Sequence, residues 1–445
     1  KGDAPKAEGV KDKFNIGTGT GNVGTGTGTL WQTIPALLAG LTLFTLYPLS
    51  NIVLLFSFWL ILSLVAAALG ADQSGRKVMM NNSSWPSILS SLAFVLVLIF
   101  GLVGGYALWR KTQGEYYFAR AQRMTIDSQA AFEETARLLA GAVNANNNDI
   151  RYLNGLGQLI LSRIGVELNN RTDQPEVVAA RLQQLTQNAV QAANQMTANY
   201  KNDTASWTNA GFIYQNLVQL IGGADEAAIA AYREALKRSP YAPEIYVRIG
   251  AVYLDRAERN RAALIDARNR RVTVRNEKEV LDLVVGDYKN AEENFKKAVE
   301  LKGDLAISLY NLGVVYERQG RVKEAVKQLE LTRAGNLANP GLAFELGLLY
   351  YRDGQKQNAF NEMARAVGLF RDYSNARWYL ALMLEEQGRI DLAIGQLKEI
   401  LKLEVNKDNP AVLEKLASLE AGKREIPPAK VTSKQPIGER APRQR

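Results

Sequence analysis

The 445-residue sequence predicts an all-α protein in which N-terminal transmembrane helices precede an α-solenoid of stacked helical hairpins. Two observations predict this fold class. Residues 14–71 contain no charged side chain, and about 20 apolar residues suffice to cross a bilayer. Further along, glycine, tyrosine and alanine recur at a regular interval, which is typical of repeated helix pairs.

The amino end divides into two predicted segments. Residues 1–30 are rich in glycine and threonine and are expected to form a flexible segment. A membrane domain over 31–111 follows, with three predicted spans near 31–47, 51–70 and 88–109. The lipid bilayer is therefore a predicted partner of this domain.

The flanking charges predict how the spans are oriented. Lys and Arg number six on the side of the amino end and four on the opposite side. Positive charge marks the cytoplasmic side of a membrane. We therefore predict a multi-pass protein of the bacterial cytoplasmic (inner) membrane, with the domain that follows the spans on the extracytoplasmic side.

The soluble part, 112–420, contains the repeat. Gly313, Gly347 and Ala381 are evenly spaced, and an alanine follows each of them at one constant distance, at 325, 359 and 393. Upstream the units lengthen, yet the step from the alanine of a second helix to the next first-helix glycine stays constant, as from 189 to 211, 228 to 250 and 291 to 313. These motifs resemble the tetratricopeptide repeat (TPR) family, whose unit is two antiparallel helices. The predicted domain is a right-handed superhelix of five to six repeats, with insertions at 158–188 and 255–285.

Packing accounts for these residue types. Small side chains at the glycine and alanine positions allow the two helices of a unit to approach closely, and tyrosines of the first helices fill the gaps between units. Gly320, Gly354 and Gly388 are predicted to end first helices as left-handed caps. The insertion 255–285 holds seven Arg between positions 256 and 275. It is either an arm that contacts an anionic partner or a solvated helix extension whose Arg pair with nearby carboxylates.

One face of the first helices is predicted to line a groove that binds a protein or a peptide. Equivalent positions carry one aromatic residue per repeat, and further large residues follow four and seven positions later. The candidate binding residues are Tyr310, Phe344, Trp378, Leu348, Tyr351 and Leu382. An aromatic row at helical spacing also fits a hydrophobic core, so both interpretations stay open.

The net charge of +9 is concentrated at the carboxyl end. Residues 421–445 carry seven Lys or Arg, two Glu and four of the 13 prolines. This composition cannot bury enough apolar surface to fold, so we expect a basic, Pro-rich disordered tail. Residues 1–420 carry only +4, and we therefore predict no nucleic-acid partner.

The composition removes most familiar catalytic chemistries. The chain has no cysteine and no histidine, so it has no thiol nucleophile, no His-based triad and no Cys or His metal ligand. We see no pair of carboxylates at acid/base spacing. The prediction is no catalytic residue, no metal site and no cofactor in this chain, and whether the chain belongs to an enzyme stays open.

The membrane end shows a second resemblance. The segments IPALLAGLTLFTLYPLSNIVLLFSFWLILSLVAAALG (34–70), GYALWRKTQGEYYFARAQ (105–122) and NNNDIRYLNGLGQ (146–158) look like the last spans and the TPR domain of bacterial O-antigen ligase and polymerase (Wzy-like) proteins. The large catalytic loop of that family has no counterpart here, so no catalytic residue carries over. The resemblance implies the C-terminal, non-catalytic part of a glycan transferase, or a stand-alone relative without its catalytic half, with glycan-assembly proteins as partners.

Two functions remain open. The first is a membrane-anchored TPR scaffold that mediates protein–protein interaction at the bacterial cell envelope. The alternative is the C-terminal part of an O-antigen ligase-like transferase. The two differ in whether the reading frame continues upstream into eight or more further spans and a long loop.

Overall fold

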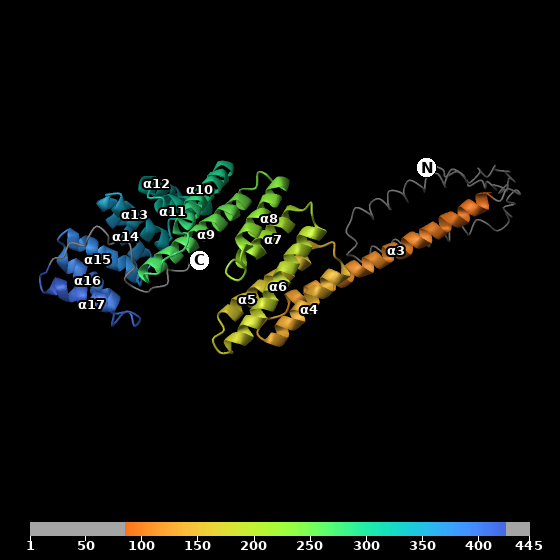
Figure 1. The fold of residues 1–445 in the computed structure, drawn as a ribbon, viewed down its shortest axis with the longest axis horizontal. Helices are drawn as coiled ribbons and strands as arrows, with labels where there is room; N and C mark the ends of the chain where they lie inside the picture. The colour runs from red at the N-terminus through yellow and green to blue at the C-terminus, as the bar shows by residue number, and fades with distance from the viewer. Residues whose placement is uncertain (1–84, 424–445) are drawn as a thin grey trace, which may run out of the picture. The chain divides into compact units, whose positions relative to one another are not determined.

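The computed structural model describes residues 85–423, which form the helices α3 to α17 with no β-strand among them (Figure 1). The all-α prediction is confirmed for this part of the chain. The Gly/Thr-rich segment, the first two predicted spans and the tail from position 424 onward lie outside the described residues. The chain divides into two compact units, 1–113 and 114–445, with the boundary inside α3.

Helix α3 (Trp85–Gln122) contains the third predicted span. Among the described residues it is the one helix that is long and apolar enough to cross a membrane, over Val95–Gln122, and none of its apolar window is buried. The other two spans stay predictions.

The remaining helices form a chain of hairpins in which each helix contacts the next one. The first helices α5 and α7 also contact each other, as do α9 and α11, so first helices of neighbouring hairpins lie on a common side. We call this the inner side of the array. The helices are α4 (Gln129–Ala145), α5 (Ile150–Leu168), α6 (Pro175–Asn199), α7 (Thr204–Asn216), α8 (Ala224–Arg238), α9 (Pro243–Asn269), α10 (Glu277–Leu301), α11 (Ala306–Arg318), α12 (Val322–Gly335), α13 (Pro340–Arg352), α14 (Lys356–Leu369), α15 (Ser374–Glu386), α16 (Ile390–Leu401) and α17 (Pro410–Glu420).

The two helices of a hairpin approach closely at the repeat glycines. A Cβ built on Gly211 would lie 2.6 Å from Cε1 of Tyr232, and one built on Gly250 would lie 2.7 Å from Cε1 of Phe295. Real Cβ atoms do not come this close, so a larger residue at either position would force the neighbouring ring to shift. The repeat alanines of the second helices are fully buried, which confirms the packing role predicted for both residue types. These alanines are Ala189, Ala228, Ala291, Ala325, Ala359 and Ala393.

The first-helix tyrosines join neighbouring hairpins, as predicted. The hydroxyl of Tyr214 donates a hydrogen bond to Oδ1 of Asn194 at 2.9 Å. The hydroxyl of Tyr253 accepts one from Nη2 of Arg233, also at 2.9 Å. Both partners lie on the second helix of the preceding hairpin, α6 or α8, so these tyrosines hold one unit against the unit before it.

The predicted left-handed caps are present. Gly320, Gly354 and Gly388 have φ of 77°, 81° and 74°, a region that L side chains rarely adopt. After Gly320, the N–H of Arg321 donates to the carbonyl of Tyr316 at 2.8 Å, which is the bond that closes a Schellman motif. These glycines therefore end helices.

The insertion 255–285 forms the outer parts of α9 and α10. Five of its seven Arg pair with carboxylates. These are Arg256, Arg259, Arg261, Arg268 and Arg270. Arg256 donates two hydrogen bonds to the buried Asp287, at 2.7 and 2.8 Å. The structure therefore favours the helix extension with internally paired Arg over an arm that contacts an anionic partner.

Candidate functional site

A cleft of about 930 Å³ opens on the inner side of the array, between α7, α9 and α11. Ligand clefts typically measure roughly 300–1000 Å³. We call it the inner cleft. Its apolar lining consists of Leu168, Phe212, Val218, Leu220, Val247, Ala251, Leu254, Leu305 and Ile307. Ile307 is 55% exposed although it is large and apolar, so the cleft presents a hydrophobic surface to solvent.

The inner cleft uses the same repeat positions as the candidate residues predicted from the sequence. Each candidate is counted from the small residue of its own first helix, which is Gly313, Gly347 or Ala381. A candidate stands three positions before this residue, one position after it or four positions after it. Counting the same offsets from Gly211 and Gly250 leads to six residues, and all of them except Thr208 line the inner cleft. The five are Phe212, Gln215, Val247, Ala251 and Leu254. Sequence reasoning missed them because the count was not carried upstream, where the units lengthen, and the constant step between hairpins could have found them.

Three carboxylates and one guanidinium also line the inner cleft. Glu244 and Asp255 are exposed. Glu258 accepts hydrogen bonds from the hydroxyl of Tyr288 at 2.6 Å and from Nε of Arg318 at 2.9 Å. Burial, together with the neighbouring carboxylate of Glu258, raises the pKa of Tyr288, so its hydroxyl remains a neutral donor. The cleft therefore combines an apolar lining with carboxylates, of which Glu244 and Asp255 are exposed.

Arg248 is the one basic residue of this lining. Its guanidinium carbon lies 5.4 Å from the ring centroid of Phe212, at cation–π distance. Burial of Tyr232 raises the pKa of its hydroxyl to about 12. The charge of Arg248 also acts on this hydroxyl and lowers the pKa, but burial has the larger effect. Arg248 therefore belongs to the wall of the cleft, where it covers an aromatic face.

The six predicted groove residues divide into two groups. Tyr310, Leu348, Tyr351 and Trp378 are half-buried. Phe344 and Leu382 are only 2% and 7% exposed. These two are corrected to packing residues, because little of either side chain is left for a ligand to contact.

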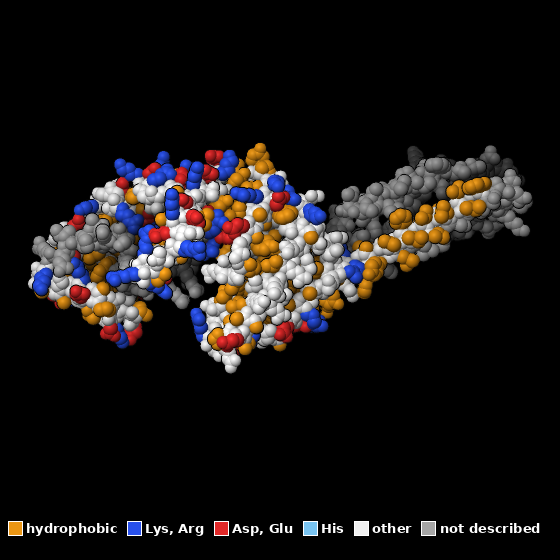
Figure 2. Space-filling model, in the orientation of Figure 1, with side chains coloured by type: hydrophobic (Ala, Val, Ile, Leu, Met, Phe, Trp, Pro, Cys, Tyr) orange, Lys and Arg blue, Asp and Glu red, His pale blue; other side chains and the backbone are white. Residues whose placement is uncertain are grey.

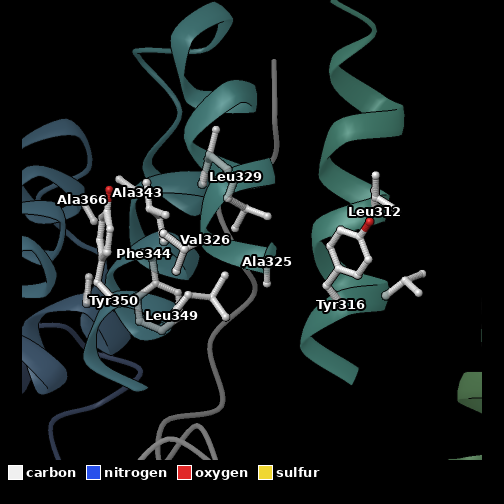
Figure 3. Close-up of a cluster of buried hydrophobic side chains, with 14 of the residues drawn as sticks. Leu312, Tyr316, Ala325, Val326, Leu329, Ala343, Phe344, Leu349, Tyr350 and Ala366 are labelled. Carbon is white, nitrogen blue, oxygen red and sulfur yellow. The ribbon is translucent and has the colours of Figure 1, made fainter. Parts of the chain in front are cut away.

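Phe344 shows the physical reason for the correction. Its ring lies in the buried cluster drawn in Figure 3. The ring centroids of Tyr373 and Tyr379 lie 5.1 and 5.6 Å from that of Phe344. These aromatic contacts pack α13 against the next hairpin and enclose Phe344.

Two of the half-buried tyrosines link successive repeats through their hydroxyl groups. Tyr310 donates to Oε1 of Glu345 at 2.9 Å, and Tyr351 donates to Oε2 of Glu386 at 3.3 Å. Burial raises the pKa of Tyr310 and also that of Glu345. The hydroxyl ends are thus engaged within the array, which leaves the exposed parts of the rings for contact with a partner.

Residues 85–423 contain no group of three or more acidic side chains placed to hold a metal ion. Two of the carboxylates that line the inner cleft have basic partners, since Glu258 binds Arg318 and Asp255 pairs with Arg259. The inner cleft therefore offers a ligand an apolar contact surface and polar groups for hydrogen bonds. The absence of a catalytic residue stays a prediction.

Comparison with known proteins supports the repeat assignment. Residues 281–338 and 344–404 match the family model of the tetratricopeptide repeat. The chain therefore contains TPR units, as predicted from the spacing of glycine and alanine. The resemblance of the membrane end to O-antigen ligases stays a prediction.

Relatives of known structure or function are distant. The human protein O-mannosyl-transferase TMTC3 is 27% identical over 205 residues, which is 43% of this chain and 22% of that protein. The chain thus spans about a fifth of the length of this curated relative. MamA from Desulfovibrio magneticus is 22% identical, with a TM-score of 0.33 and coverage of 44% of this chain and 97% of that chain. YrrB, described as a TPR protein with an unusual peptide-binding site, is 18% identical, with a TM-score of 0.38 and coverage of 50% and 97%.

Proposed function

We propose that this chain is a membrane-anchored TPR scaffold that binds a protein or peptide partner at a bacterial envelope membrane. The inner cleft is the observation that carries this proposal. Its lining residues come from three successive first helices, so a ligand bound there contacts several repeats at once. An apolar lining with few polar groups suits the side chains of a peptide.

The chemistry of the inner cleft indicates the type of peptide. Apolar anchors of the ligand would pack on Phe212, Leu254 and Ile307. Basic side chains of the ligand would face the exposed carboxylate of Glu244 and would compete with Arg259 for that of Asp255. The half-buried Tyr310, Leu348, Tyr351 and Trp378 extend the surface along the following repeats.

Helix α3 supports the membrane anchor, because its stretch Val95–Gln122 is long and apolar enough to cross a membrane. A short connection then joins α3 to α4, where the array begins. The proposed location is the cytoplasmic (inner) membrane of a bacterium, with the repeats outside the cytoplasm. Protease added to intact spheroplasts should then cleave the repeat array. Complete protection of the array would contradict the proposed orientation.

A peptide library displayed on phage tests the groove directly. Selection against the full chain in lipid nanodiscs should enrich peptides that combine large apolar residues with Lys or Arg. Ile307→Asp should weaken binding of a selected peptide at least tenfold, because it places a charge in the apolar lining. Leu331→Asp is the matched control, since Leu331 is 50% exposed but lies on the second helix α12. Equal effects of the two substitutions, or no enrichment, would refute the groove.

A second candidate is the C-terminal, non-catalytic part of an O-antigen ligase-like glycan transferase. The similarity to a relative named as an O-mannosyl-transferase favours it. Sequencing the gene upstream of this stretch tests it. Eight or more further spans and a long loop would support the transferase, and their absence would contradict it.

A further inference from the structure

Helix α6 carries a surface without charge. The stretch from Leu182 to Tyr200 contains no charged side chain, in a chain of which 22% is charged. Eight side chains of this stretch are Asn or Gln, and all eight are exposed. Figure 2 shows mostly white and orange atoms along α6, in contrast to the blue and red side chains on the later helices.

A cleft of about 1030 Å³ runs along this helix and is bounded by the turn that follows α7. We call it the α6 cleft. None of the residues that line it is charged. Its apolar part is formed by Leu182, Val190, Leu220 and Ile221. Its amides are Gln183, Gln187, Gln191, Asn194, Gln195 and Asn199.

The amides of the α6 cleft are available to a ligand. Within residues 85–423 only one of the six, Asn194, makes a hydrogen bond, which it accepts from the hydroxyl of Tyr214 at 2.9 Å. Five of the six follow one another at every fourth position, from Gln183 to Asn199. Four helical residues rise about 6 Å, so the amides form a ladder beside the apolar strip.

This combination selects a neutral, hydroxyl-rich ligand. A charged ligand would lose hydration in the α6 cleft and find no opposite charge. Each amide has two donor hydrogens and an acceptor oxygen, and each sugar hydroxyl likewise donates and accepts. The apolar strip can pack against the C–H faces of sugar rings. We propose that the α6 cleft binds an uncharged oligosaccharide chain.

A second copy of this chain is a less suitable occupant. The amide face extends over about 20 residues, or about 30 Å, on a helix roughly 10 Å wide. That area of about 300 Å² is well below the roughly 800 Å² that each partner of a standard interface buries. A narrow chain ligand fits the cleft without needing so large a contact.

Binding of defined neutral oligosaccharides tests this proposal. Maltoheptaose, mannohexaose and chitohexaose are titrated by calorimetry against the full chain in lipid nanodiscs, because maltoside detergents carry sugar groups of their own. At least one of them should bind saturably. Its affinity should not change between low and high salt, since no ion pair is formed.

Paired variants of α6 identify the binding face. Gln183→Ala with Gln187→Ala should weaken binding at least tenfold, whereas Gln184→Ala with Asn188→Ala should change it less than twofold. The second pair has the same chemistry on the same helix but does not line the α6 cleft. Alanine favours helix, so both double variants are expected to fold.

Three outcomes would overturn the proposal. The first is that none of the three oligosaccharides binds. The second is that the two double variants have equal effects. The third is that light scattering detects self-association of the chain, and that Gln183→Ala with Gln187→Ala abolishes it while the other double variant does not. Ile307→Asp in the inner cleft should leave oligosaccharide binding unchanged. The linings of the two clefts share Leu220 alone, and no variant alters it, so failure of one site is distinguishable from failure of the other.

Discussion

Gly250→Ala tests whether the close approach of α9 and α10 requires glycine. The added methyl group would meet three ring atoms of Phe295 at 2.7–2.9 Å. Phe295 is fully buried and cannot turn away to solvent. Alanine gains about 1 kcal/mol over glycine in a helix interior, but overpacking a core costs about 1–3 kcal/mol. The expected net result is a loss of stability of up to about 2 kcal/mol.

Gly286→Ala in α10 is the matched control, because a Cβ there meets nothing within 4 Å. It should stabilise its helix by about 1 kcal/mol. The helix-propensity gain is common to both variants, so their difference of about 1–3 kcal/mol isolates the packing cost. Hydrogen exchange followed by mass spectrometry on α9 and α10 measures both changes in the full chain.

A double variant sharpens this test. Phe295→Leu removes ring atoms that the new methyl group would meet. The cost of Gly250→Ala should therefore fall by at least half in the Phe295→Leu background, which is a coupling between neighbouring residues. Equal stabilisation by Gly250→Ala and Gly286→Ala would show that the hairpin has room for a methyl group, and the packing argument would be wrong.

Two further predictions concern charged groups of the array. Asp287→Ala removes the bidentate partner of the largely buried Arg256, which keeps Glu226 as a second partner. It should cost about 2 kcal/mol by hydrogen exchange, because hydrogen bonds to a charged group are lost. Asp266→Ala, which breaks an exposed ion pair, should cost less than about 0.5 kcal/mol. Burial raises the pKa of Glu345 above its ordinary 4.5, so ionisation of this group opposes folding, and stability is gained as pH falls through the raised pKa. Glu345→Gln keeps an acceptor for Tyr310 and should stabilise the array at neutral pH, with an advantage that fades as the pH falls toward the ordinary pKa of a glutamate. Denaturant unfolding at several pH values measures this, and an advantage that does not change with pH would contradict it.

The repeat could be predicted from the sequence because the same packing contact recurs in every hairpin and requires the same type of residue at the same position. Wherever a second helix crosses a first helix, space remains only for a small residue, and Gly211 and Gly250 mark these crossings directly. Helix ends were equally readable, since a left-handed cap such as Gly320 strongly favours glycine.

The site was less predictable, because burial depends on residues outside the repeating pattern. Phe344 occupies a position equivalent to Tyr310 and Trp378, but Tyr373, just before α15, packs against its ring. The α6 cleft could not be predicted from the sequence for a different reason. Its defining side chains are amides, and a search for hydrophobic periodicity passes over them.

The constant step between hairpins separates two properties of the array. The stacking of one hairpin on the next is fixed by that step, whereas the length of each hairpin varies freely, as α9 and α10 demonstrate. Extra sequence at the far end of a hairpin therefore leaves the register of all later repeats unchanged. The turn between Asn269 and Glu277 is accordingly a place where a fluorescent or affinity module can be inserted while the inner cleft keeps its shape.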